Sequence, residues 1–194
     1  MLLALALAFT TAVRGSDLPA AVCVVSPRVE ALSQGDARGE VPLPRPQLVV
    51  VEPLQEVRIE RGGRLVWRRE ARAGQPIQGP LGWPVAPIAP GEEVLLRLRP
   101  RLAPEGAYAH VELIGSQADR MKAAEALVGT LGDRPAAWGA AIEAALVASD
   151  VPLAWALLFH PRVPADPELQ ALRAEVIQRG RLVCIEIHVT GLAM

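Results

Sequence analysis

The hydrophobic periodicity of the chain changes near residue 116, and this change constrains the fold more than any other feature. Before residue 116, apolar and polar residues alternate in short segments separated by Gly and Pro. After it, apolar residues recur at spacings of three and four. Alternation is typical of half-buried strands, and the wider spacing is typical of amphipathic helices. The sequence therefore predicts a mainly β fold with a C-terminal α part.

The β part is expected over residues 47–115. Residues 47–52 contain a β-branched run, and Val57 and Ile59 alternate with charged residues before a Gly-Gly turn, which predicts a hairpin with residues 65–67. Residues 93–101 and 108–114 alternate again beyond a Pro-rich connection. About six strands with Gly and Pro turns predict an immunoglobulin-like β-sandwich.

Short helices are expected to follow over residues 116–180. Each predicted start has a residue suited to capping a helix N-terminus, and these residues are Ser116, Asp133, Asp150 and Asp166. Four helices joined by short loops should fold back on one another as antiparallel hairpins. The alternation over residues 181–190 then predicts a terminal strand within 181–194.

The N-terminus resembles an export signal. Residues 1–13 are almost entirely apolar, which fits a secretory signal, and the stretch is shorter than the roughly 20 residues that cross a bilayer. We expect residues 1–15 to be a signal peptide, no transmembrane segment, and a periplasmic or extracellular protein. The alternative is an ordinary buried first helix. Residues 16–46 are rich in Pro and Gly and are expected to form an irregular lead-in.

Cys23 and Cys184 are the two cysteines of the chain. In an exported protein two cysteines can form one disulfide, so our hypothesis is that they are bonded. The alternative is that both are buried, unpaired thiols. Their wide separation does not fit the ligand spacing of a zinc site.

Charge and motifs exclude several function classes. The 20 basic side chains face 21 acidic ones, for a net charge of −1, so we expect no nucleic-acid binding. The chain has neither a nucleophile elbow nor a phosphate-binding loop. No catalytic residue, resident metal or cofactor is therefore predicted.

Two groups of polar residues remain as candidate sites. His110 and Glu112 are two positions apart in one expected strand, and Glu186 and His188 repeat that spacing in another, so four metal ligands would converge if the strands were neighbours. The alternative is an ordinary solvated strand face. A stripe of arginines, Arg97, Arg99 and Arg101, could contact an anion; the alternative is an exposed strand whose arginines pair with neighbouring Glu side chains.

Several short motifs carry a resemblance to a known group of proteins. They are the run Val-Cys-Val-Val-Ser-Pro at 22–27, Leu-Val-Trp at 65–67, Pro-Gly at 90–91 and Trp-Ala-Leu at 155–157. Together with the export signal, they resemble small exported cyanobacterial proteins of unknown function. The resemblance implies secretion and a sandwich-plus-helices layout, and it brings no catalytic residues.

The leading prediction is an exported, non-enzymatic binding or interaction module of the cell envelope. Its partner would be an unknown envelope protein or an anionic glycan. The rival predictions are a metal-dependent hydrolase that uses the His/Glu group and a structural component of the envelope.

Overall fold

The structure is a computed structural model that describes residues 22–32 and 36–191, and only the backbone of residues 181–191. Strands come first and four helices follow, which confirms the predicted order. The signal peptide predicted at residues 1–15 lies outside the described residues. The elements are β1 (Val24–Ser26), β2 (Glu30–Ala31), β3 (Asp36–Val41), β4 (Val49–Val50), β5 (Leu54–Arg61), β6 (Arg64–Glu70), β7 (Glu93–Pro100), β8 (Ala109–Gly115), α1 (Ala118–Leu131), α2 (Pro135–Val147), α3 (Val151–Leu158) and α4 (Pro167–Gly191).

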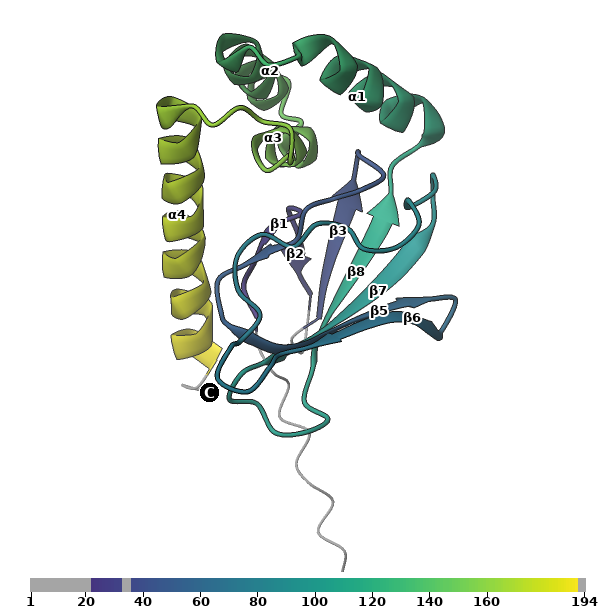
Figure 1. The fold of residues 1–194 in the computed structure, drawn as a ribbon, viewed down its shortest axis with the longest axis vertical. Coiled ribbons are helices and arrows are strands. Elements are labelled where there is room, and N and C mark those ends of the chain that lie inside the picture. Colours follow the sequence, from purple (N-terminus) through teal and green to yellow (C-terminus); the bar gives the residue numbers. More distant parts are fainter. Residues whose placement is uncertain (1–21, 33–35, 192–194) are drawn as a thin grey trace, which may run out of the picture.

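The strands form two sheets of unequal size. Six strands pair in the order β2-β3-β8-β7-β5-β6, and β1 pairs with β4 in a separate two-stranded sheet. All neighbours are antiparallel except β3 and β8, which run parallel toward the helices (Figure 1). β6 and β2 are consequently the edges of the large sheet.

Local sequence accounts for the central strands. Gly62 and Gly63 have φ of 53° and 72°, the pair of positive angles that a two-residue type I′ turn requires, so the predicted hairpin of β5 and β6 is confirmed. In β7 the inward residues Val94, Leu96 and Leu98 are each 0% exposed, which confirms the predicted alternation. These inward side chains form the core beneath the large sheet.

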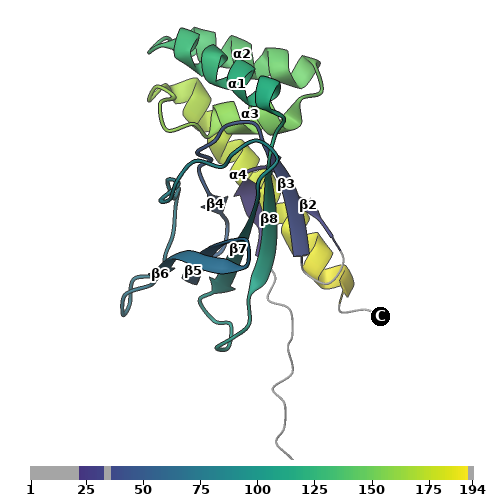
Figure 2. The same ribbon diagram turned by 90° about the vertical axis from the view of Figure 1, so that its right-hand side faces the viewer.

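The two-stranded sheet separates two hydrophobic cores. Val24 and Val50 pack into the core of the large sheet, whereas Val25 and Val49 pack into the core formed with the helices. Figure 1 shows α4 running beside β1, with α1 to α3 gathered at the end of the large sheet where β3 and β8 finish, and Figure 2 shows the same arrangement from the side. Both faces of this small sheet are therefore buried.

The helix caps agree with the sequence at two of the four expected positions. Asp150 accepts the backbone N–H of Leu153 at 3.0 Å, and Asp166 accepts those of Glu168 and Leu169. Helices α1 and α2 have no side-chain cap, so the predicted roles of Ser116 and Asp133 are wrong. Each of these two residues lies one position too early, since the N-cap positions are the next residues in the chain, Gln117 and Arg134.

The structure corrects two further predictions. The irregular lead-in of residues 16–46 contains β1, β2 and β3 among its described residues. The predicted terminal strand in 181–194 is not formed, because α4 continues past Gly180 to Gly191. A Cβ at Gly180 would meet Cγ2 of Val25 at 3.2 Å, so this glycine allows α4 to pack closely on β1 and does not end the helix. Among the described residues, no helix is long and apolar enough to cross a membrane.

Candidate binding surface on the six-stranded sheet

The outward face of the large sheet is covered by paired charges. Because side chains alternate between the two faces of a strand, the residues between the core positions all point to this side. They form ion pairs along and across β3, β8, β7, β5 and β6. The residues of these pairs are Asp36, Arg38, Glu56, Arg58, Glu60, Arg68, Glu70, Arg97, Arg99, His110 and Glu112.

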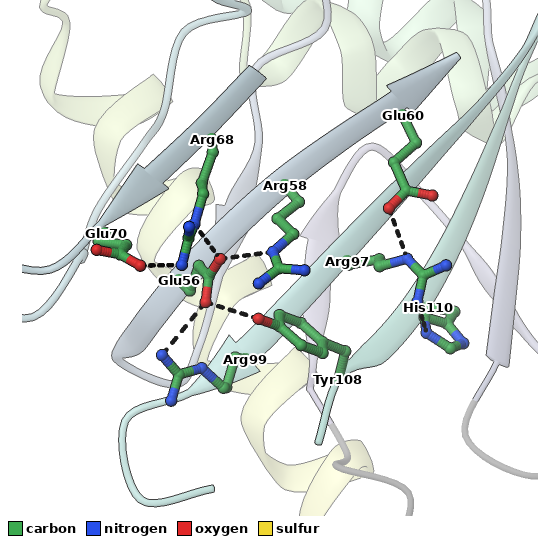
Figure 3. Close-up of polar contacts among 9 residues, drawn as sticks. All are labelled: Glu56, Arg58, Glu60, Arg68, Glu70, Arg97, Arg99, Tyr108 and His110. Atoms are coloured by element: carbon green, nitrogen blue, oxygen red, sulfur yellow. Dashed lines mark hydrogen bonds and ion pairs between the residues drawn. The ribbon is translucent and has the colours of Figure 1, made fainter. Parts of the chain in front are cut away.

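Glu56 is the centre of this charged face (Figure 3). Its carboxylate is 1% exposed and accepts hydrogen bonds from Arg58 at 2.5 Å and Arg68 at 2.6 Å. Its other oxygen accepts from Arg99 at 3.2 Å and from the hydroxyl of Tyr108 at 2.6 Å. Four donors from β5, β6, β7 and the segment before β8 therefore converge on one carboxylate.

The electrostatics of Glu56 follow from this arrangement. Burial alone would raise the pKa of Glu56, but the hydrogen bonds from Arg58, Tyr108 and Arg68 outweigh it and lower the pKa to about 2. The pKa of Tyr108 is raised by burial and by its hydrogen bond to Glu56. The guanidinium of Arg58 also lies 4.7 Å from the centre of the Tyr108 ring, a cation–π distance. The low pKa keeps Glu56 ionised at neutral pH, and its hydrogen bonds join neighbouring strands.

The candidate metal ligands His110, Glu112, Glu186 and His188 lie on a strand and a helix, not on two strands as predicted. Glu186 and His188 lie in α4, and their side chains are outside the described residues. His110 and Glu112 do share one strand face. His110 Nδ1 lies 3.3 Å from Asp36, and Glu112 pairs with Arg38 at 2.7 Å. No group of three potential metal ligands occurs among the described side chains.

The predicted arginine stripe is largely neutralised. Arg97 pairs with Glu60 at 2.8 Å and Arg99 pairs with Glu56, as the alternative interpretation of an exposed strand with Glu partners predicted. Arg101 lies beyond β7 in an exposed turn. The stripe does not present three uncompensated charges to an anion.

The edge strand β6 is seven residues long and largely open to solvent. It has β5 on one side only, and each of its residues except Trp67 is exposed. Leu65 and Val66 are 53% and 45% exposed. The sequence predicted the hairpin but not which of its strands would be an edge, because strand order depends on pairing with β7 far along the chain. Arg64 and Arg68, on either side of this apolar segment, were the sequence signal for an edge strand, because edge strands commonly carry charged residues.

Cys23 lies beside α4, the helix whose sequence includes Cys184. Its Sγ is 3.4 Å from the carbonyl oxygen of Gly180, about one helical turn before Cys184, and its backbone N–H donates to Glu52. The side chain of Cys184 is outside the described residues, so the disulfide stays a prediction.

Comparison of the chain with protein-family models, with curated proteins and with solved structures gives no match.

Proposed function

We propose that the protein is an exported, non-enzymatic binding module of the cell envelope that binds a partner protein along the edge strand β6. The observation that carries the proposal is the exposure of this strand. β6 has one neighbour in the sheet and leaves two adjacent apolar side chains, Leu65 and Val66, open to solvent. A free strand edge is a template on which another extended segment can pair.

The backbone of β6 is oriented for such pairing. The N–H of Ala71 donates to Gln55 at 2.8 Å, and in an antiparallel ladder only every second residue faces its neighbour. In the register of β5 and β6, Arg68 and Glu70 are the intervening residues, so their backbone N–H and C=O groups point away from β5. An added strand would hydrogen-bond to these groups, as in strand-addition recognition of peptides.

A protein partner is favoured over an anionic glycan. The glycan proposal depended on free guanidinium groups at Arg97, Arg99 and Arg101, and the first two are engaged by carboxylates. Backbone pairing at β6 is chemistry that a polypeptide offers and a glycan does not.

The three parts of this proposal have different support. Export rests on the apolar residues 1–13 and on the resemblance to small exported cyanobacterial proteins. A role in binding, and not only as a structural envelope component, rests on β6. The immunoglobulin-like sandwich is supported by the stacking of the small sheet on the large one, and the parallel pair of β3 and β8 departs from that all-antiparallel pattern.

Site-specific photo-crosslinking in cells tests the proposal. A photoreactive residue at position 65 or 66 should give the same discrete adduct with one envelope protein. The controls are positions 102 and 147, where Leu102 and Val147 are 94% and 81% exposed and so collide with other proteins more readily. Equal adducts from all four positions, or adducts from positions 65 and 66 with cytosolic proteins only, would contradict the proposal.

A further inference from the structure

The arginines of the strands differ in whether a carboxylate neutralises them. They are Arg38, Arg58, Arg61, Arg64, Arg68, Arg69, Arg97 and Arg99. Within the described part of the chain, all except Arg64 and Arg69 form an ion pair with Asp or Glu. Both exceptions are exposed and both lie on β6. The sheet therefore compensates its positive charge everywhere but at its open edge.

The two uncompensated arginines lie on the same face of β6. Arg69 is opposite Val57, Trp67 is opposite Ile59, and Arg64 is opposite Arg61 across the ladder. Val57, Ile59 and Arg61 alternate along β5 and so share one face, and opposed residues of an antiparallel pair point to the same side. Arg64 is three positions from Trp67, so simple alternation would put these two residues on opposite faces. The register shift between Ile59 and Glu60 brings Arg64 onto the same face as Trp67. An arginine thus stands on each side of a partly buried tryptophan.

We infer that the segment bound along β6 is an extended acidic strand in which two carboxylates flank an apolar residue at alternate positions. This inference rests on the proposed strand addition at β6. The carboxylates would face Arg64 and Arg69, and the apolar residue would pack on Trp67, which already contacts the core of the sheet. Opposite charges directly across a strand pair stabilise it, and like charges destabilise it.

The same charges disfavour a second copy of this chain as the occupant. Residues 64–72 carry four arginines and one glutamate, and Arg72 is also exposed and without an ion pair among the described residues. Two such edges side by side would bring like charges together, whereas an acidic segment would neutralise them.

Synthetic nine-residue peptides test the inference against the full-length mature protein. The acidic peptide has Glu-Thr-Val-Thr-Glu at its centre, and matched peptides carry Gln or Lys in place of both Glu residues. Binding is measured by fluorescence anisotropy in low salt, and hydrogen exchange of the Arg68 and Glu70 amides reports whether the peptide pairs along β6. We expect the acidic peptide to bind about tenfold more tightly than the Gln peptide, with the difference largely lost at about 0.5 M salt.

Charge reversal provides the matched control. The double variant Arg64→Glu/Arg69→Glu should bind the Lys peptide more tightly than the acidic peptide. The control variant Arg134→Glu/Arg162→Glu makes the same change of charge on exposed residues of the helical part, and it should keep the preference for the acidic peptide. If the Gln and Lys peptides protect the β6 amides as well as the acidic one, the acidic preference is wrong and strand addition stands. If no peptide protects these amides, both the acidic preference and strand addition at β6 are wrong. Both are also wrong if the protein alone forms a dimer along β6.

Discussion

Glu56 should make the stability of this protein depend on pH in acid. In the native state the pKa of Glu56 is about 2, against an ordinary value of 4.5. A group whose pKa is lowered by folding contributes stability that is complete above its unfolded pKa and is lost as the pH falls toward its folded pKa. A difference of about 2.5 pKa units, at about 1.4 kcal/mol each, corresponds to roughly 3 kcal/mol. This stabilisation should be present at pH 7 and should disappear between about pH 4.5 and pH 2.

The variant Glu56→Gln tests this magnitude directly. It keeps the size of the side chain but leaves Arg58, Arg68 and Arg99 without their shared carboxylate. We expect the free energy of unfolding by urea, followed by tryptophan fluorescence, to fall by about 3 kcal/mol at pH 7. The gap between wild type and variant should narrow steadily as the pH is lowered from 5 to 2.5.

A matched control uses an exposed carboxylate on the same sheet. Glu93, at the start of β7, is exposed. Glu93→Gln should change the free energy of unfolding by less than about 0.5 kcal/mol, both at pH 7 and at pH 2.5. A Glu56→Gln variant as stable as wild type at pH 7, or a gap that stays constant down to pH 2.5, would refute the reasoning.

Arg120, the two cysteines and the N-terminal segment give three further predictions. Arg120 pairs with carboxylates of β3 and of the α3 cap, so Arg120→Ala should lower the free energy of unfolding by about 1 kcal/mol in urea titrations, whereas Arg134→Ala should not. The unreduced protein should show a bond between Cys23 and Cys184 in mass spectrometry, and two alkylatable thiols would dispose of it. The mature protein from cells should lack residues 1–15, and retention of the initial methionine in a cytosolic fraction would overturn export.

The sequence predicted those parts of the fold that depend on neighbouring residues. The glycine turn between β5 and β6 and the alternation of β7 are local signals, and both are confirmed. Two other glycines misled the prediction because their role is non-local. A Cβ at Gly39 would lie 2.6 Å from the carbonyl oxygen of Arg28, and Gly180 packs against Val25, so each permits close approach of a distant segment. In the sequence alone, each glycine indicates only an interruption of regular structure.

The charged face was partly predictable for the same reason. The alternation of Arg97 and Arg99 placed them on one side of a strand, and the interpretation with Glu partners anticipated their neutralisation. Glu56 was not recognised, because its importance arises only when β6, β7 and the Tyr108 segment are placed around it. That placement depends on strand order, which no short stretch of sequence encodes.

The small sheet of β1 and β4 has a consequence for how the molecule can be divided. Val24 and Val50 pack into one hydrophobic core and Val25 and Val49 pack into the other, so this small sheet is shared by both cores. A fragment that ends before α1 would expose Val25 and Val49 to water. A fragment that starts at α1 would lack the small sheet on which its helices pack. The boundary visible along the chain at residue 116 is therefore not a line along which the folded body separates, and its two halves should melt together.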